Sequence, residues 1–103
     1  MEFVETPIFT RQIMQLLDSD SYREFQNELL LNPELGKLIR GGAGIRKVRW
    51  VLPNKGKSGG IRIIYYYKAI QNTIYLLFAY QKNIVDNLSD KQVSQLAILV
   101  KDL

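Results

Sequence analysis

The sequence predicts an α+β domain in which an antiparallel-rich β-sheet has N-terminal helices packed on one face and is followed by a C-terminal helix. Helical spacing of apolar residues in the first third of the chain, three apolar runs rich in Ile, Val and Tyr, and a return to helical spacing at the end lead to this prediction. A chain of 103 residues is long enough for one two-layer core, so we expect a single domain spanning residues 1–103.

The N-terminal part is expected to form a short strand and two helices. Residues 3–6 fit a strand, and residues 9–17 carry apolar positions on one helical face. A second helix is expected over residues 21–31, because its opening Ser-Tyr-Arg-Glu matches a capping box, in which two side chains accept hydrogen bonds from amides at the helix start. Pro33 disfavours its continuation, and residues 34–39 are expected to add one further turn.

Three β-strands are expected at residues 44–52, 61–69 and 73–81, and their short separations favour antiparallel hairpins. Alternation gives the first two strands one apolar and one cationic face. The third is apolar on both faces, as expected for a central strand covered by helices. Strict alternation divides the side chains of this strand into two sets, Ile74, Leu76 and Phe78 against Tyr75, Leu77 and Ala79.

A last helix is expected after Ser89, where Ser-Asp-Lys-Gln repeats the capping-box pattern. Four apolar residues follow at the spacing of a buried helical face: Val93, Leu96, Ala97 and Val100. The sequence therefore indicates helices packed on one face of the sheet, with the cationic face left uncovered.

The amino-acid composition limits the chemistry of the chain. It contains no cysteine and no histidine, so it offers no disulfide, no thiolate metal site and no imidazole. We therefore expect no metal or other cofactor, and catalysis has to use Lys, Arg, Tyr, carboxylates or backbone groups. The N-terminus lacks a signal-peptide pattern, and no apolar run approaches the roughly 20 residues that span a bilayer, so we expect a cytoplasmic protein without a membrane partner.

Positive charge is concentrated in the middle of the chain. Between Leu35 and Val85 there are ten Lys and Arg residues and no Asp or Glu, although the net charge of the whole chain is only +4. Aromatic residues are interspersed among these cations, a mixture that suits a polyanion with stackable bases, and RNA is the first such partner to test. The cations are Lys37, Arg40, Arg46, Lys47, Arg49, Lys55, Lys57, Arg62, Lys68 and Lys82.

Several of these cations are expected to share the uncovered sheet face. Attack of a ribose 2′-hydroxyl on its own phosphate needs a base, an acid and cationic stabilisation of the crowded phosphorane. A lysine crowded by other cations can serve as the base, while arginine stays charged and holds the phosphate. Our candidates for this chemistry are Lys47, Arg49, Lys57, Arg62, Tyr80 and Lys82. Our candidates for neighbouring RNA contacts are Arg46, Lys55, Tyr66, Lys68 and Asn83.

The candidates also have other interpretations. Lys55 and Lys57 can be solvated loop residues, and Arg62 can pair with a carboxylate of an N-terminal helix. Tyr80 can act as an acid or as a stacking surface. The cationic block contains no carboxylate, which argues against a Mg²⁺-dependent nuclease. Core positions are expected for Trp50, Tyr65 and Tyr67.

The sequence resembles the RelE/HigB toxins of bacterial toxin–antitoxin systems over nearly its whole length, and the HigB-type branch most of all. The most specific part is the glycine–arginine–aromatic block at residues 56–66, Gly-Lys-Ser-Gly-Gly-Ile-Arg-Ile-Ile-Tyr-Tyr. Further matching positions are Tyr22, Arg23, Phe25, Gln26, Glu28, Leu29, Asn32, Pro33, Leu35, Gly36, Gly44, Arg46, Lys47, Arg49 and residues 80–83.

This resemblance implies a RelE-like fold and a ribosome-dependent endoribonuclease, or mRNA interferase, that cuts mRNA in the A site and inhibits translation and growth. It also implies a cognate antitoxin, expected to be a helix-turn-helix DNA-binding protein of the HigA type. By position, Lys47, Arg49 and Arg62 match the cationic active-site residues of these toxins. Lys82 matches the lysine beside the late active-site position.

Two positions depart from the family pattern. Asn83 stands where RelE has a catalytic arginine, and no tyrosine follows it in residues 84–89, so Tyr80 and Lys82 are the candidates to substitute. The same scaffold serves ParE-type toxins, which inhibit DNA gyrase without cutting RNA. A gyrase inhibitor and a non-catalytic RNA-binding module are therefore the alternatives, and the density of cations over residues 47–62 favours the nuclease.

Overall fold

The computed structural model describes residues 1–51, 60–82 and 87–103 of the chain. A short strand and two helices are followed by four strands and a third helix. None of the helices in these ranges is long and apolar enough to cross a membrane. The elements are β1 (Glu2–Glu5), α1 (Pro7–Leu16), α2 (Ser19–Leu31), β2 (Lys37–Leu38), β3 (Ile45–Val51), β4 (Gly60–Lys68), the 3₁₀ turn η1 (Ala69–Gln71), β5 (Thr73–Gln81) and α3 (Asp90–Lys101).

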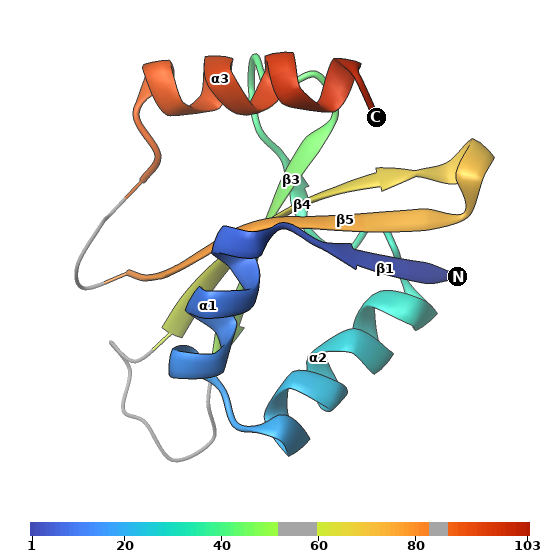
Figure 1. Cartoon of the computed structure of the whole chain (residues 1–103), viewed down its shortest axis with the longest axis vertical. Helices are drawn as coiled ribbons and strands as arrows, with labels where there is room; N and C mark the ends of the chain where they lie inside the picture. The colour runs from blue at the N-terminus through green and yellow to red at the C-terminus, as the bar shows by residue number, and fades with distance from the viewer. Residues whose placement is uncertain (52–59, 83–86) are drawn as a thin grey trace.

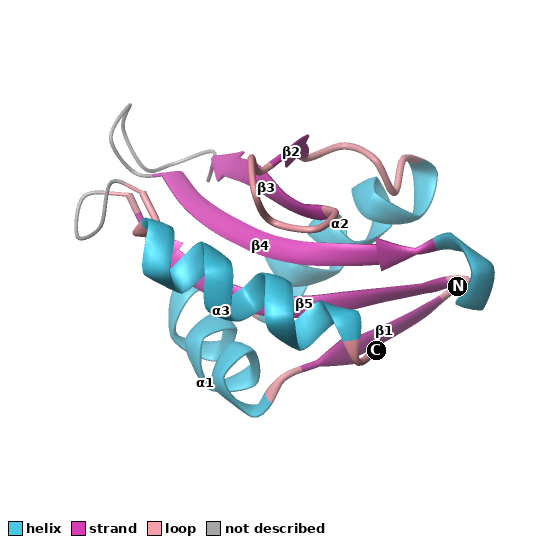
Figure 2. Cartoon of the chain, turned by 90° about the horizontal axis from the view of Figure 1, so that it is seen from above, coloured by secondary structure: helices cyan, strands magenta, loops and turns pink. Residues whose placement is uncertain are grey.

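The strands form one sheet in the order β1-β5-β4-β3-β2. β1 runs parallel to β5, and the other three neighbouring pairs are antiparallel. α1 and α2 lie on one face of the sheet, whereas α3 crosses the opposite face (Figure 1, Figure 2). The expected α+β class and antiparallel-rich sheet are therefore confirmed. The expectation of an uncovered second face is wrong for the part beneath α3.

Two hydrophobic cores fix the helices to the sheet. Burying one large apolar side chain stabilises the fold by about 1.5–3 kcal/mol, so each core anchors the strand residues that contribute to it. The core between the sheet and α1 and α2 includes Phe9, Phe25, Leu29, Ile63 and Tyr65. The core beneath α3 includes Ile64, Leu77, Tyr80, Val93 and Val100.

Tyr65 ties the segment after α2 to the middle of the sheet. Its ring is fully buried, and its hydroxyl donates to the Pro33 carbonyl and accepts from the Gly36 amide, both at 2.8 Å. Trp50 and Tyr67 are partly buried against the same core. The expected core positions of these three aromatic residues are therefore confirmed.

The two capping-box predictions have different outcomes. At α3, Ser89 accepts from the Gln92 amide and the Gln92 side chain accepts from the Ser89 amide, so the prediction is confirmed. At α2 the prediction is wrong, because the helix starts earlier and Asp18 accepts from the Ser21 amide at 2.8 Å. Aspartate is as good an N-cap as serine, and here it comes first in the chain.

The helical turn expected over residues 34–39 is also wrong, because this segment contains β2. Lys37 pairs with Lys47 of β3, and Leu38 pairs with Arg46. The chain returns through a tight loop in which Gly41 has a φ of 77°. That left-handed conformation costs glycine little, and it brings β3 alongside the segment. Pairing with a neighbouring strand thus overrides the local helical pattern.

β5 contains a β-bulge that strict alternation does not predict. Ile64 of β4 pairs with Phe78, but the next residue, Tyr65, pairs with Leu76, so Leu77 is an extra residue in β5. A bulge of this kind reverses the facing of the side chains that follow it. The division of the strand expected from alternation is therefore correct as far as Leu77 and wrong from Phe78 onward.

The bulge turns the end of β5 over. Phe78 and Tyr80 lie with Leu77 in the core beneath α3, while Ala79 lies in the core beneath α1 and α2. Without the extra residue, Phe78 and Tyr80 would share the opposite face with Leu76. The bulge therefore determines on which face of the sheet the Tyr80 side chain lies.

Candidate active site

Three polar side chains form a line across neighbouring strands of the sheet. Arg49 of β3 pairs with Arg62 of β4, and Arg62 pairs in turn with Tyr80 of β5. Residues paired directly on antiparallel strands point to the same face. The structure therefore brings together three of the residues that the sequence predicts as catalytic, on the face that α3 partly covers.

Arg62 is buried without a strong partner. Its side chain is 8% exposed, and its hydrogen bond to the Ile61 carbonyl is long, at 3.4 Å. Among the described residues, no carboxylate lies within 4.0 Å of this guanidinium, so the alternative ion pair with an N-terminal helix is not found there. A guanidinium has five N–H donors, and the unused donors of Arg62 keep some access to solvent, because among the described residues the buried unpaired side-chain atom is the Tyr80 hydroxyl. The site is therefore arranged to receive an anion.

Gly60 leaves room for both guanidinium groups. A Cβ built at Gly60 would lie 3.1 Å from a terminal nitrogen of Arg62 and 3.7 Å from Nε of Arg49. Any side chain here would therefore press on Arg62, because its Cβ would stand closer than ordinary van der Waals contact allows. The two arginines converge above this glycine, so one anion there can contact both.

Tyr80 contributes a protonated hydroxyl beside Arg62. The residue is 6% exposed, and the hydroxyl has no hydrogen-bond partner within the described part of the chain. Burial raises the pKa of Tyr80, although the charge of Arg62 acts in the opposite direction. The phenol therefore carries its proton at neutral pH. The ring is too buried for a base to stack on it, so the geometry argues against the role of stacking surface.

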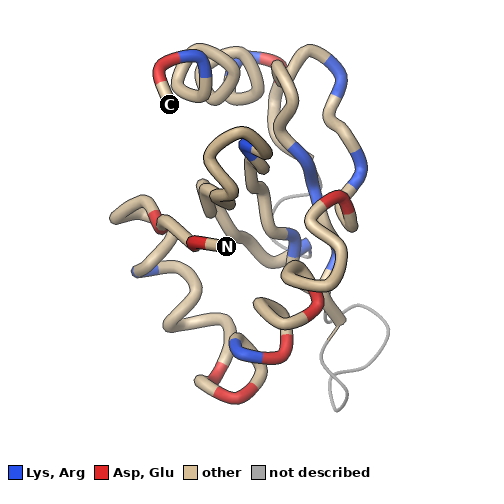
Figure 3. The backbone as a smooth tube through the Cα atoms, turned by 90° about the vertical axis from the view of Figure 1, so that its right-hand side faces the viewer, with Lys and Arg blue, Asp and Glu red and all other residues tan. Residues whose placement is uncertain are grey.

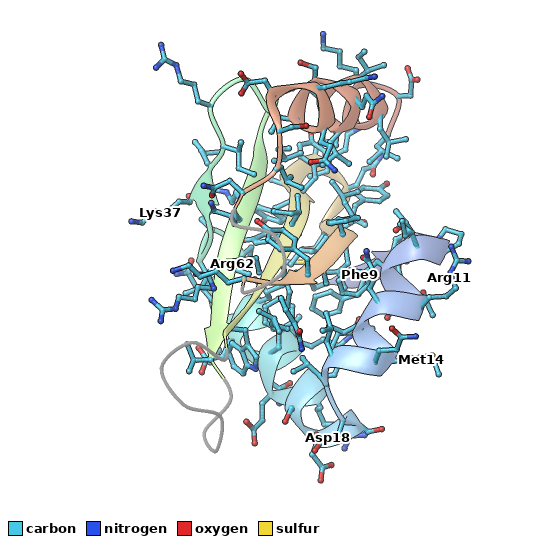
Figure 4. The ribbon with its side chains drawn as sticks, turned by 90° about the vertical axis from the view of Figure 1, so that its left-hand side faces the viewer. Phe9, Arg11, Met14, Asp18, Lys37 and Arg62 are labelled. Atoms are coloured by element: carbon cyan, nitrogen blue, oxygen red, sulfur yellow. The ribbon has the colours of Figure 1, made fainter. Side chains whose placement is uncertain are left out.

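A groove beside the arginines collects further cations. It encloses about 460 Å³, and its charged or aromatic lining residues are Glu28, Lys37, Lys47, Arg49, Trp50 and Arg62. Lys and Arg lie along the strands on this side of the molecule, whereas several Asp and Glu residues lie on α2 and on the turn before it (Figure 3). The Lys37 side chain reaches outward into solvent, while Arg62 lies over the sheet (Figure 4). The groove thus combines exposed and buried cations.

Lys47 and Lys82 lie on two sides of this region. The Lys47 ammonium donates to the side-chain oxygen of Asn87 at 3.0 Å, which links β3 to the segment before α3. The Lys82 amide donates to the Gly60 carbonyl at 3.3 Å, which brings the exposed Lys82 next to the strand end that carries Arg62. Lys47 therefore shares the groove with the arginines, whereas for Lys82 the structure shows that its backbone lies at the end of the strand that carries Arg62.

Arg46 does not join this group. It pairs with Tyr65 across β3 and β4, so it faces the side of the sheet opposite to Arg49. Its guanidinium donates to the Gly36 carbonyl at 2.8 Å and lies 3.7 Å from a carboxylate oxygen of Glu34. These contacts give Arg46 a structural role, in fixing the segment after α2.

Tyr66 and Lys68 lie further along β4, away from Arg62. Tyr66 packs in the core beneath α3 and stacks on Tyr75, with ring centroids 6.3 Å apart. The Lys68 ammonium donates to the Leu103 carbonyl. Six residues of strand separate Lys68 from Arg62, which corresponds to about 20 Å. Neither residue belongs to the groove.

Three predicted residues, Lys55, Lys57 and Asn83, lie outside the described residues. Within the described ranges, no three acidic side chains come close enough to hold a metal ion, and the chain has no His or Cys.

The structure adds residues that the sequence did not place in the site. Lys37 enters the groove only because β2 pairs with β3, which the local pattern did not predict. Glu28 projects from α2 as the single carboxylate among the groove residues. The role of Gly60 could have been predicted from the sequence, because a glycine two residues before an arginine on the same strand leaves space beside that arginine.

This arrangement can be compared with known proteins. Residues 35–103, which include all of β2 to α3, match the family described as the RelE toxin of the RelE/RelB toxin–antitoxin system. The chain belongs to the RelE toxin family. It is therefore the toxin component of a toxin–antitoxin system, as the sequence resemblance implied. The family match does not single out the HigB branch, which stays a prediction.

Solved structures agree with this RelE assignment. A double arginine-to-alanine mutant of the Escherichia coli toxin RelE in the free state has a TM-score of 0.61 at 16% identity, covering 96% of this chain and 95% of that one. The intact Escherichia coli RelBE toxin–antitoxin complex gives a TM-score of 0.57 at 18% identity, covering 78% of this chain and 94% of that one. At these identities the similarity establishes the RelE-like fold.

Proposed function

We propose that this RelE-family toxin is a metal-independent endoribonuclease that cuts mRNA on the ribosome and thereby stops translation and growth. The observation that carries the proposal is the pairing of Arg49 with a buried Arg62 that has no carboxylate partner among the described residues. A phosphate is the anion that such a pair suits, because guanidinium groups bind it through paired N–H donors.

The reaction proposed is attack of a ribose 2′-hydroxyl on the adjacent phosphate. A bond forms between the 2′-oxygen and phosphorus, the bond to the 5′-oxygen breaks, and the products end in a 2′,3′-cyclic phosphate and a 5′-hydroxyl. Arg49 and Arg62 stabilise the charge that builds on the phosphorane, which is the largest electrostatic demand of the step. Tyr80 supplies the proton that the leaving 5′-oxygen takes up.

Lysine is the proposed base or electrostatic partner, in the absence of histidine. Lys47 lies on β3 next to Arg49, and the backbone of Lys82 lies at the end of the strand that carries Arg62. Lys57 is the third candidate, from the part of the chain that is not described. A base of this kind is weak, so we propose that the ribosome aligns the 2′-hydroxyl with the phosphate. Such alignment can raise a reaction rate by several orders of magnitude.

We also propose that a cognate antitoxin silences the toxin by covering the cationic groove. The similar RelBE structure is a complex of a toxin with its antitoxin. An acidic segment would complement the lysines and arginines of the groove, as charged interfaces generally do. A helix-turn-helix DNA-binding antitoxin of the HigA type is the specific partner proposed.

Primer extension on a defined mRNA in a purified translation system tests the proposed activity. We expect breaks at the A-site codon with the wild-type protein, none when ribosomes are omitted, and none with Arg62→Ala. Lys68→Ala is the matched control, because it removes a cation from the same strand outside the groove. Intact mRNA with unimpaired translation would contradict the proposal and lead next to a DNA gyrase supercoiling assay.

A further inference from the structure

Beyond Leu76, the outer edge of β5 is held by α1 and its cap. The pairing of β1 with β5 ends at Leu76. After that residue, the Thr6 hydroxyl donates to the Leu77 carbonyl at 2.9 Å, and the Ala79 amide donates to the side-chain oxygen of Gln12 at 2.8 Å. The N-cap residue of α1 and a residue from the middle of that helix thus bond the bulged residue and the position two residues after it.

These bonds matter because a bulge leaves backbone groups outside the regular ladder. Such groups are costly to bury unless side chains or water satisfy them. Thr6 satisfies the carbonyl of the bulged residue, while the same hydroxyl accepts from the Phe9 amide and caps α1. Gln12 satisfies the next outward-facing amide. Both bonds stabilise the register in which Tyr80 faces Arg62.

The competing register has space available to it. An open cavity of about 320 Å³ lies beside Gln12, and Ala79, Tyr80 and Gln81 line it from the strand side. Strict alternation after Leu76 would turn Tyr80 toward α1 and away from Arg62. The bonds from α1 therefore act together with the packing of Leu77 and Tyr80 beneath α3 in holding the observed register.

We propose that Gln12 and Thr6 are positioning residues that hold the Leu77 bulge and so aim the Tyr80 hydroxyl at Arg62. Neither side chain touches the substrate in this account, and both act through Tyr80. The inference rests on the proposed function, in which Tyr80 is the proton donor.

Gln12→Met tests the inference, because it keeps the length of the side chain and removes the oxygen that accepts from the Ala79 amide. We expect this variant to cut ribosome-bound mRNA about fivefold more slowly, the effect of one lost hydrogen bond. Gln12→Glu keeps a side-chain oxygen and is expected to retain the wild-type rate. Circular dichroism melting of each variant shows that the fold is retained.

A double-mutant cycle separates positioning from a general effect on structure. In a Tyr80→Phe background, Gln12→Met is expected to cause no further loss of rate, because the residue through which it acts is already gone. An equal loss in both backgrounds would overturn the inference and leave the proposed nuclease intact. If Tyr80→Phe itself cut at the wild-type rate, the assignment of Tyr80 would fail instead.

Thr6→Asp provides a second test if Gln12→Met fails to fold. Aspartate keeps an N-cap acceptor for the Phe9 amide but cannot donate to the Leu77 carbonyl. We expect a loss of rate that again disappears in the Tyr80→Phe background, whereas Thr6→Ser, which keeps the hydroxyl, should cut at the wild-type rate. A Thr6→Asp rate equal to wild type would contradict the proposal.

Discussion

Arg49 and Arg62 stand directly opposite each other on β3 and β4, as a cross-strand pair of like charges. Such a pair destabilises a sheet, and among the described residues no carboxylate lies within 4.0 Å of Arg62 to offset it. The hydrophobic cores on both faces of the sheet supply the stability that tolerates this repulsion. A fold that keeps two cations together in this way is prepared for an anionic ligand.

Arg49→Gln is expected to stabilise the free toxin while it weakens cleavage. Removing one of two opposed charges should raise the free energy of unfolding by about 0.2–1 kcal/mol at low salt, and the gain should shrink as salt screens the repulsion. Urea denaturation at two salt concentrations measures this. Arg11→Gln, on the exposed face of α1 and away from the helix ends, is the control. An unchanged or lower stability at low salt would show that the pair is not repulsive in the free protein.

Gly60→Ala is expected to reduce cleavage without unfolding the protein. The added Cβ would lie 3.1 Å from Arg62 and push its guanidinium out of place. A small misplacement of a catalytic group can lower the rate about tenfold to a hundredfold. Cleavage of ribosome-bound mRNA gives the rate, and thermal melting verifies the fold. A wild-type rate would mean that the position of Arg62 above Gly60 is unimportant.

Tyr22, with its partly buried hydroxyl, is expected to lower the free energy of unfolding at alkaline pH. Its hydroxyl donates to Glu5 at 2.5 Å, and burial together with this carboxylate raises the pKa of Tyr22 well above its ordinary value of 10.0. Above about pH 10 the unfolded chain releases this proton and the native protein keeps it, so the free energy of unfolding falls as the pH rises.

Tyr22→Phe is therefore expected to lower stability by about 1 kcal/mol at pH 7 but to reduce the further loss between about pH 9 and pH 11. Urea denaturation across this range is the measurement. Tyr75→Phe, which removes a hydroxyl bonded to Gln71 near the surface, is the control and should keep the alkaline loss. An identical alkaline loss in Tyr22→Phe would contradict the assignment.

Lys37→Ala is expected to weaken binding to RNA uniformly over different sequences. Lys37 lines the groove and extends into solvent, so we expect it to contact phosphate rather than a base. Loss of one phosphate contact should reduce the slope of log affinity against log salt by about 1. Fluorescence anisotropy with two unrelated oligoribonucleotides measures this, with Lys101→Ala as the control. An unchanged slope would place Lys37 outside the RNA-binding surface.

The local sequence predicted the parts of the fold that depend on local signals. Ser89 and Gln92 predict the start of α3, and the three runs rich in Ile, Val and Tyr predict β3, β4 and β5. What failed depends on contacts between distant segments. β2 exists because Lys37 pairs with Lys47 across a tight loop. The start of α2 is a different case, since Asp18 and Ser21 both carry local capping signals and the structure uses Asp18.

The candidate site was predictable where residues lie on regular strands. Alternation placed Arg49 and Arg62 on one face, and the register pairs them. Alternation alone gave the wrong facing for the end of β5, because the bulge at Leu77 is held by bonds from Gln12 and Thr6 that lie far away in the sequence. No pattern of single residues encodes such a contact.

The most direct measurement is end-group analysis of mRNA fragments produced on purified ribosomes, with wild-type toxin and with Arg62→Ala. We expect A-site fragments that end in a 2′,3′-cyclic phosphate and begin with a 5′-hydroxyl. We expect these fragments to be lost in Arg62→Ala and to be retained in Lys68→Ala. Fragments with 5′-phosphate ends, or equal cleavage by Arg62→Ala, would contradict a reaction driven by this pair of arginines.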